Sequence, residues 1–265
     1  MEVQVLGSVF LTFENKQYAL ASKRVSTVLT LLALSPREVV PSDQLVDELW
    51  GDRQMSNARN ALQANVVRLR KYLESITGTK GGELIRTVGS GYLLDVPPEA
   101  VDAHRFLKLA EDGAELVHRD PAEAIVRLEQ ALALWRGPAL MDACEGLRCR
   151  IGATHLEERR ITVYEDLTAA KLAVEAHRVS VSELRQLAAE HSERERLSEL
   201  LMLALYRDGR QAEALEVFHG ARRRLANDLG LEPGRALHRI YQAILTQDEV
   251  LGEPRQALAY TAPTS

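Results

Sequence analysis

Residues 57–75 read NARNALQANVVRLRKYLES, and residues 84–94, after a short loop, read LIRTVGSGYLL. In the first stretch, apolar residues recur every three or four positions, which places them along one side of a helix. In the second, apolar residues lie on both sides of Gly89-Ser90-Gly91, which is typical of a β-hairpin with a tight turn. The two stretches together predict a polar, basic helix followed directly by a short hairpin.

A basic helix followed by a glycine-tipped hairpin is the pattern of a winged helix-turn-helix, and it makes double-stranded DNA the leading partner. The preceding residues fit this interpretation. Residues 1–20 alternate in the manner of strands and predict a small antiparallel sheet. Residues 23–34 and 42–50 have helical spacing and predict two further helices. Ser56 or Asn57 is expected to cap the third helix.

The composition is that of a soluble globular protein, with 46% hydrophobic and 27% charged residues among 265 and a net charge of −5. There is neither an apolar run of membrane-spanning length nor an amino-terminal export signal, so we expect a cytoplasmic protein. Between Arg53 and Arg86, seven Lys and Arg residues outnumber two Glu, a local excess of five. That excess suits DNA phosphates, whereas the acidic remainder, mostly beyond residue 97, suits a protein-facing role.

Strand patterns disappear after Pro97-Pro98, and a series of helices is expected: 102–118, 121–136, 143–177, 180–191, 195–208, 211–228 and 233–247. Residues 195–228 resemble a tetratricopeptide (TPR) unit, because the spacing of Ala214, Phe218 and Ala221 lets two antiparallel helices approach closely. A plain helical bundle is the alternative. We therefore expect an α+β winged-helix domain over residues 1–96, an all-α TPR-like domain over 97–252 and a disordered tail over 253–265.

The order of motifs also resembles a known family. VVPSDQLVDELWG at 39–51, the helix from residue 57 and the hairpin from residue 84 together resemble the OmpR-type winged helix. Their coupling to DAHRF at 102–106, ALALWRGPAL at 131–140 and LANDLGLEPG at 225–234 resembles the Streptomyces antibiotic regulatory protein family. In that family the second half is called the bacterial transcriptional activation domain. The resemblance covers roughly residues 1–250 and is to the short members of the family.

The resemblance implies a transcriptional activator of a secondary-metabolite (antibiotic) biosynthetic gene cluster. Such a protein binds direct repeats of double-stranded DNA near the −35 region, with a dimer on DNA as one arrangement. It recruits the RNA polymerase holoenzyme through the sigma factor and the carboxy-terminal domain of the alpha subunit. The sequence itself leaves open a repressor with the same DNA-binding domain. It also leaves open an adaptor whose helical half binds protein and whose winged helix is only a docking module.

A recognition helix presents to the major groove only the side opposite its buried stripe. Gln63, Ala64 and Arg68 lie on that side and are the predicted base-reading residues. Gln63 is suited to adenine, Arg68 to O6 and N7 of guanine, and the methyl group of Ala64 to the methyl group of thymine. For Gln63 and Arg68, a solvated side chain without a DNA contact is the alternative.

Residues beside this strip, in the hairpin and at the start of the first helix are candidates for contact with the DNA backbone. For three of them there are alternatives within the protein: Arg59 pairing with Asp47, Arg70 with an acid on the second helix, and Tyr92 packing in the core. The hairpin tip lacks the arginine that many OmpR-type wings insert into the minor groove. The full set of backbone candidates is Asn57, Arg59, Asn60, Val67, Arg70, Lys71, Arg86, Thr87, Ser90, Tyr92, Lys23 and Arg24.

Catalytic motifs are missing from the sequence. It has no G-x₄-G-K-[S/T], no H-E-x-x-H and no G-x-S-x-G, so we expect no enzyme activity, cofactor or metal. Cys144 and Cys149 are too few for a disulfide scaffold or a metal site. Salt dependence distinguishes a DNA-binding protein from an adaptor. Neutralising about five phosphates predicts a log–log slope of the binding constant against salt of about −4 or −5.

Overall fold

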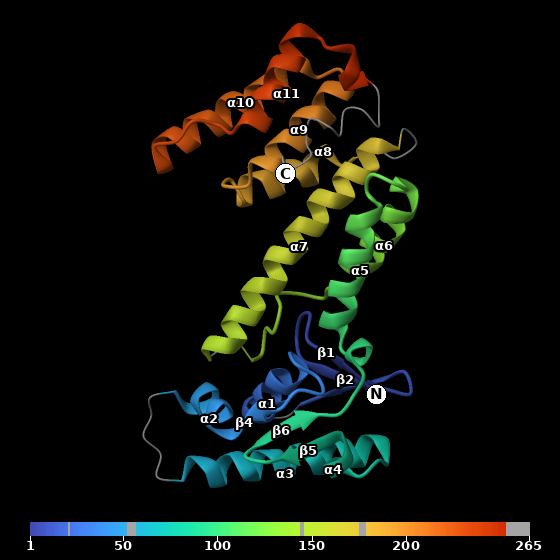
Figure 1. Ribbon diagram of the computed structural model, residues 1–265, viewed down its shortest axis with the longest axis vertical. Helices are drawn as coiled ribbons and strands as arrows, with labels where there is room; N and C mark the ends of the chain where they lie inside the picture. The colour runs from blue at the N-terminus through green and yellow to red at the C-terminus, as the bar shows by residue number, and fades with distance from the viewer. Residues whose placement is uncertain (21, 52–56, 144–145, 175–178, 253–265) are drawn as a thin grey trace. The chain divides into compact units, whose positions relative to one another are not determined.

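The structure is a computed structural model that describes residues 1–20, 22–51, 57–143, 146–174 and 179–252 (Figure 1). The predicted tail and the alternative cap Ser56 lie outside these residues. The chain forms two compact units, one of Met1–Ala110 and Gln130–Ile161, the other of Glu111–Glu129 and Thr162–Ser265. Three helices contribute to both units: α5 (Asp102–Leu116), α6 (Pro121–Ala133) and α7 (Leu147–Ala173).

The first unit begins with the predicted antiparallel sheet, formed by β1 (Glu2–Gln4), β2 (Phe10–Phe13) and β3 (Lys16–Ala19). Val3 pairs with Leu11, and both side chains are fully buried. The β2–β3 turn places Glu14 and Asn15 at positive φ, 47° and 61°, as a two-residue hairpin turn of type I′ requires. The strand pattern in residues 1–20 therefore predicted this sheet correctly.

The helix-turn-helix consists of α1 (Lys23–Ala33), α2 (Ser42–Trp50) and α3 (Ala58–Thr77). Its core consists of the apolar side chains that helical spacing placed on the inner sides of these helices. Fully buried examples are Val28, Leu29, Leu32, Leu45, Leu69 and Leu73. Burying each such side chain contributes roughly 1.5–3 kcal/mol, so this core fixes the side that α3 leaves in solvent.

After α3 come the short helix α4 (Gly81–Leu84) and the hairpin of β5 (Ile85–Val88) and β6 (Gly91–Leu94). A third strand, β4 (Val40–Pro41), pairs with β6 and ties the hairpin to the start of α2. The two-residue turn has Gly89 at a φ of 55°. A Cβ atom at Gly91 would lie 2.5 Å from the carbonyl oxygen of Val40, so this position requires glycine.

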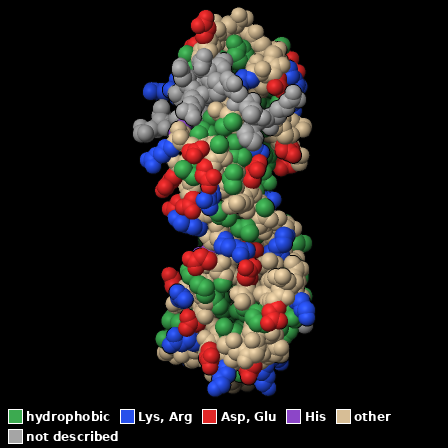
Figure 2. Space-filling view, turned by 90° about the vertical axis from the view of Figure 1, so that its right-hand side faces the viewer, with side chains coloured by type: hydrophobic (Ala, Val, Ile, Leu, Met, Phe, Trp, Pro, Cys, Tyr) green, Lys and Arg blue, Asp and Glu red, His purple; other side chains and the backbone are tan. Residues whose placement is uncertain are grey.

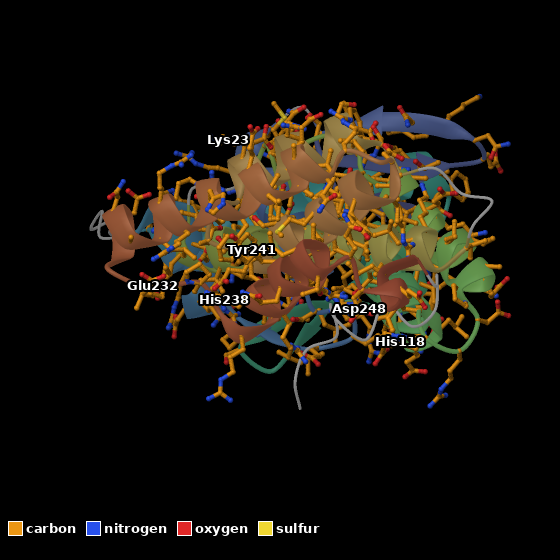
Figure 3. The ribbon with its side chains drawn as sticks, turned by 90° about the horizontal axis from the view of Figure 1, so that it is seen from above. Lys23, His118, Glu232, His238, Tyr241 and Asp248 are labelled. Carbon is orange, nitrogen blue, oxygen red and sulfur yellow. The ribbon has the colours of Figure 1, made fainter. Side chains whose placement is uncertain are left out.

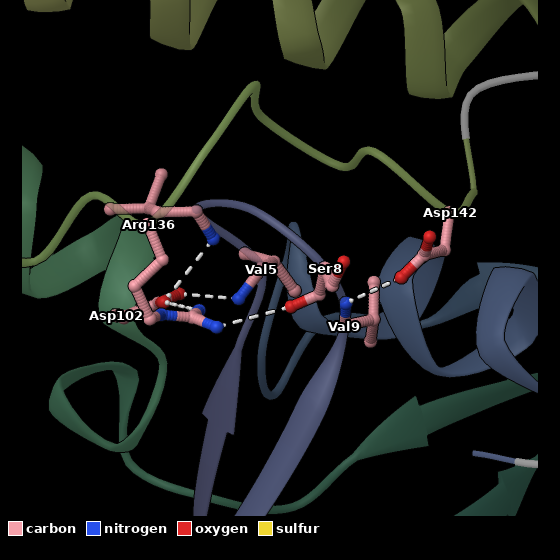
Figure 4. Close-up of polar contacts among 7 residues, drawn as sticks. Val5, Ser8, Val9, Asp102, Arg136 and Asp142 are labelled. Carbon is pink, nitrogen blue, oxygen red and sulfur yellow. Dashed lines mark hydrogen bonds and ion pairs between the residues drawn. The ribbon is translucent and has the colours of Figure 1, made fainter. Parts of the chain in front are cut away.

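The connection between β1 and β2 is hydrogen-bonded to residues on the helical side of Pro97-Pro98 (Figure 4). The carboxylate of Asp102 accepts the amides of Val5 at 2.7 Å and Leu6 at 3.2 Å, and a guanidinium donor from Arg136 at 3.0 Å. Burial raises the pKa of Asp102, and these three donors act in the opposite direction. A second carboxylate, that of Asp142, accepts the amide of Val9 at 3.0 Å.

Helix α7 begins at Leu147, four residues later than its predicted start, and its first turn is capped by a residue of the helix-turn-helix. The buried carboxylate of Glu48 on α2 accepts the amide of Arg148 at 2.6 Å and that of Cys149 at 3.3 Å. A carboxylate at this end of a helix satisfies amides that have no partner within the helix and complements its dipole. Gly146 permits the approach, since a Cβ atom there would meet Glu48.

The second unit contains the predicted helical pairs. Its elements are α8 (Val181–Glu190), α9 (Glu195–Arg207), α10 (Gln211–Arg224) and α11 (Arg235–Thr246), with a π-helical turn at Leu225–Leu229. Ala214, Phe218 and Ala221 are buried on α10, as the TPR-like spacing predicted. The ring of Phe218 stacks on that of Tyr241 with 4.0 Å between centroids, and Figure 3 shows Tyr241 and His238 on α11.

Candidate nucleic-acid interface

Helix α3 has one continuous exposed side that faces away from the core. Asn60, Ala64, Val67 and Lys71 recur on it at helical spacing, and Gln63 and Arg68 flank this row. Leu62, Val66 and Leu69 lie on the opposite, buried side. All three predicted base-reading residues are therefore exposed on one surface of the predicted recognition helix. Val67 is 47% exposed, which is high for a valine and leaves an apolar group in the middle of a polar strip.

Arg68 has one contact that orients it. Its Nη1 donates to Oδ1 of Asn65 at 3.5 Å, and Nδ2 of the same asparagine donates to the carbonyl oxygen of Ala61 at 2.9 Å. Asn65 is buried, with 3% of its surface exposed. This contact uses one N–H of the guanidinium group, so a buried amide fixed by a backbone hydrogen bond orients the group while its other donors stay available. Sequence spacing had not identified Asn65 as part of this site.

At the amino end of α3, the predicted backbone-contact residues are partly engaged with one another. Asn57 occupies the cap position, but its side chain makes no capping hydrogen bond and accepts Nδ2 of Asn60 at 3.0 Å. Arg59 pairs with Asp43 at 2.7 Å, not with Asp47 as the alternative interpretation proposed. Both side chains of this pair are about three-quarters exposed, at 75% and 73%. Such exposed pairs contribute little to stability, so the pair does not prevent Arg59 from contacting a phosphate.

Arg70 connects α3 to the hairpin and does not pair with an acid on α2. Its Nε donates to the carbonyl oxygen of Ile85 at 2.9 Å, and its Nη2 donates to Oγ1 of Thr87 at 2.8 Å. Its guanidinium carbon also lies 5.9 Å from the ring centroid of Tyr92. These contacts fix the hairpin relative to the predicted recognition helix. They assign a structural role within the protein to Arg70 and to Thr87, and a DNA contact by either remains a prediction.

The other hairpin candidates differ in exposure. Tyr92 is 7% exposed and belongs to the core, in agreement with the alternative interpretation. Arg86 is exposed but pairs with Asp95 at 3.1 Å. Ser90 is exposed at the tip, and its carbonyl oxygen accepts the amide of Ser42 at the start of α2. The hairpin thus presents mainly backbone and small side chains at its tip.

Lys23 and Arg24 are both exposed at the start of α1. The guanidinium carbon of Arg24 lies 5.8 Å from the ring centroid of Trp50, which orients the arginine beside the end of α2. The contact with Trp50 accounts for the position of Arg24 without any interaction with DNA. That Lys23 or Arg24 contacts a DNA phosphate remains a prediction.

The ion pairs within the protein decide which positive charges of α3 and the hairpin are free to face DNA phosphates. In the described part of the helix and hairpin, Arg68, Lys71 and Lys80 form no ion pair, whereas Arg59 and Arg86 form exposed ones. Figure 2 shows Lys and Arg side chains, with acids among them, at the lower end of the view, where Figure 1 places α3. Arg53, which contributed to the predicted excess of charge, lies outside the described residues.

Comparison with known proteins matches both halves of the chain. Residues 15–94 match the family described as "Transcriptional regulatory protein, C terminal", and residues 101–245 match the bacterial transcriptional activator domain. The chain is 44% identical to transcriptional regulator RedD of Streptomyces coelicolor over 96% of this chain and 73% of that protein. It is 35% identical to regulatory protein DnrI of Streptomyces peucetius over 94% of this chain and 93% of that protein.

A solved structure has the same fold. It is EmbR of Mycobacterium tuberculosis in complex with a low-affinity phosphopeptide, with a TM-score of 0.89 and 27% sequence identity. The match covers 97% of this chain and 69% of EmbR. This likeness confirms a winged helix followed by a TPR-like helical half. Within the described residues, no helix has the length and apolar character needed to span a membrane.

These matches define the class of protein as a DNA-binding transcriptional regulator with an OmpR-type winged helix. More narrowly, the chain belongs to the Streptomyces antibiotic regulatory protein family and is a transcriptional activator of that type.

Proposed function

We propose that this activator binds direct repeats in double-stranded DNA near the −35 region of promoters in a secondary-metabolite biosynthetic cluster. Bound there, with two protomers on two repeats, it recruits the RNA polymerase holoenzyme through the sigma factor and the carboxy-terminal domain of the alpha subunit. The observation that carries the DNA part of this proposal is the exposed strip of α3, from Asn60 to Lys71, opposite a fully packed core. The family of the chain supports the activation part.

The chemistry of the strip suits a major groove. Gln63 offers an amide for adenine, Arg68 a guanidinium group for guanine, and Ala64 and Val67 apolar surface for thymine methyl groups. Each well-formed bidentate contact discriminates against a wrong base by about 1–3 kcal/mol. Lys71, Asn60 and Asn57 lie beside these groups and suit phosphate oxygens. Arg70 holds the hairpin against α3, which supports a contribution of the amides at the hairpin tip to phosphate binding.

The first test is the selection of genomic fragments by the purified protein, with Arg68→Ala in parallel. We expect the wild type to enrich fragments that share a direct repeat beside promoters and the variant to lose part of that consensus. Enrichment of no consensus by the wild type would contradict sequence-specific binding. The adaptor alternative would then become the better explanation, with the helical half as the place to seek a protein partner.

The salt dependence of binding to a selected site gives a second, independent measurement. With Lys71 and Lys80 as the phosphate-facing cations, one protomer gives a log–log slope of about −2. Displacement of the acids that pair with Arg59 and Arg86 raises its magnitude to about 3.6. A slope near zero would exclude phosphate neutralisation as the basis of binding. Transcription from the selected promoter with purified polymerase then distinguishes an activator from a repressor.

A further inference from the structure

The first unit contains a groove of about 400 Å³ between α1, α5 and the start of α7, on residues that the DNA interface does not use. The buried side chains of Leu31 and Leu156 contribute to its floor, and the half-buried Leu107 lies beside them. Ile151 lines the groove as well, although 60% of this isoleucine is exposed. The groove is therefore lined by buried apolar side chains, and it is open to solvent at Ile151.

The apolar surface continues along α7. Leu147 lies one helical turn before Ile151, and it is 61% exposed. Large aliphatic side chains that are mostly exposed and adjacent on one helix face mark an interaction surface more often than isolated exposed ones do. The two residues extend the apolar groove to the first turn of the helix.

The protein holds this surface in place before any partner arrives. Glu48 caps the first turn of α7 through the amides of Arg148 and Cys149. Gly152 lets α7 approach α1, because a Cβ atom there would lie 3.1 Å from Cδ1 of Leu34. A docking surface on a fixed helix does not have to be ordered upon binding, which favours affinity.

Among the described residues that line the groove, the formal charge at pH 7 is the single positive charge of Arg148. The ionisable residues among its lining are His104, Arg148 and His155, and none of the described lining residues is acidic. Arg148 and His155 are exposed. A nearby acid on α7, Glu157, is engaged by the amide of Ala139 at 2.7 Å and by Arg160 at 3.5 Å. A partner segment that fits this groove therefore combines apolar side chains with carboxylates.

We propose that the groove docks a short acidic, amphipathic segment of the RNA polymerase holoenzyme. The apolar side chains of that segment cover Leu147 and Ile151, and a carboxylate pairs with Arg148. This inference rests on the proposed function, in which the polymerase is the partner, and adds the surface of this chain that binds it and the chemistry of the segment that it binds.

The test uses the full chain on promoter DNA with the purified holoenzyme of the host bacterium as probe. Ile151→Glu and Leu147→Glu each remove apolar contact and place a carboxylate against an acidic segment. We expect each to weaken polymerase binding to the protein–DNA complex by about tenfold or more, as loss of a central interface residue does. Arg148→Ala is expected to weaken binding by roughly threefold at low salt and by less at high salt. DNA affinity should stay unchanged in all three variants, and thermal stability should stay unchanged in Ile151→Glu and Leu147→Glu. Arg148→Ala also removes a hydrogen bond from Arg148 to Gln44 on α2, so its thermal stability is measured separately.

Val126→Glu is the matched control, because Val126 on α6 is 46% exposed and is not one of the described residues that line the groove. It should recruit polymerase as the wild type does. If Ile151→Glu also recruits normally, the groove is not the docking site, whereas the proposed function stands. If the wild type itself recruits no polymerase, the proposed function fails and this inference fails with it.

A photo-crosslinking residue at position 151 identifies the occupant directly. Crosslinks to an acidic, apolar-flanked segment of a polymerase subunit support the proposal. Crosslinks only to a second copy of the chain, or to its own second unit, overturn it. The same crosslinker at position 126 measures the background.

Discussion

Replacing Arg70 by alanine separates a structural role of this arginine from a DNA contact. In the structure, its guanidinium group donates to the carbonyl oxygen of Ile85 and to the hydroxyl group of Thr87, 2.9 and 2.8 Å away. Arg70→Ala removes both hydrogen bonds and the contact with the ring of Tyr92. Because these bonds connect α3 to the hairpin, we expect the loss to appear in the stability of the folded chain.

The magnitude follows from the contacts. A hydrogen bond with a charged donor contributes about 1.5–3 kcal/mol when buried. Arg70 is half-buried and Thr87 is exposed, so the lower end applies and the two bonds together contribute about 3 kcal/mol. For a protein of this size, each kcal/mol corresponds to a shift of roughly 2–4 °C in Tm. Arg70→Ala should therefore lower Tm by about 6–12 °C.

The neighbouring Lys71→Ala is the control, since Lys71 is exposed on the predicted DNA face. It should leave Tm within about 1 °C of the wild type and reduce the magnitude of the salt slope by about one. Thermal unfolding and salt-dependent DNA binding of both variants complete the comparison. An Arg70→Ala protein that keeps the wild-type Tm but loses one unit of salt slope would refute the structural role and restore Arg70 as a phosphate contact.

Three further variants test other parts of the structure. Arg68→Ala should weaken specific binding by about 1–3 kcal/mol and relax the preference at one base position in a selection experiment. An unchanged consensus would mean that another face of α3 reads DNA. Glu48→Gln should lower the free energy of unfolding, measured by chemical denaturation, by about 1–2 kcal/mol, because the cap of α7 loses its charge. Asp47→Asn is the control: it changes an exposed carboxylate one residue earlier and should leave the free energy of unfolding unchanged. Burial of Glu199 on α9, with Glu195 adding to the effect, raises its pKa to about 7 from an ordinary 4.5. The folded state therefore holds a proton that the unfolded state loses, so stability should fall by up to about 3 kcal/mol as pH rises from 4.5 to 7. Glu199→Gln should remove that fall, and an equally steep pH profile in the variant would assign it to other groups.

Hydrophobic spacing was sufficient to predict which side of α3 is buried. Leu62, Val66, Leu69 and Leu73 repeat at helical intervals, and all four are buried. That repeat depends only on the geometry of one helix, so a single sequence contains the information. The exposed strip of α3 was predictable for the same reason, because it is the side opposite this stripe.

Spacing did not predict what the polar side chains contact. Asp43 and Asp47 lie four residues apart on α2, and the sequence alone offered no reason to choose Asp43 as the partner of Arg59. The acceptor of Arg70 is a backbone carbonyl oxygen, which has no signature in the side-chain pattern. The cap of α7 comes from a residue 100 positions earlier, Glu48. Such contacts depend on how separate elements pack, and neither propensity nor periodicity reports that.

The predicted division at Pro97-Pro98 separates two sequence patterns, but the first compact unit includes residues on both sides of it. The amides of Val5 and Leu6 belong to the amino-terminal sheet region, and their acceptor is Asp102. Buried amides without an acceptor cost about 1–3 kcal/mol each, so this region depends on residues of the helical half. Through the contact of Glu48 with α7, the same dependence extends to the helix-turn-helix. The start of α7, with its exposed apolar side chains, is consequently held in the same unit as the predicted recognition helix. A partner bound there would have a defined position relative to the DNA site, as an activator that acts by recruitment requires.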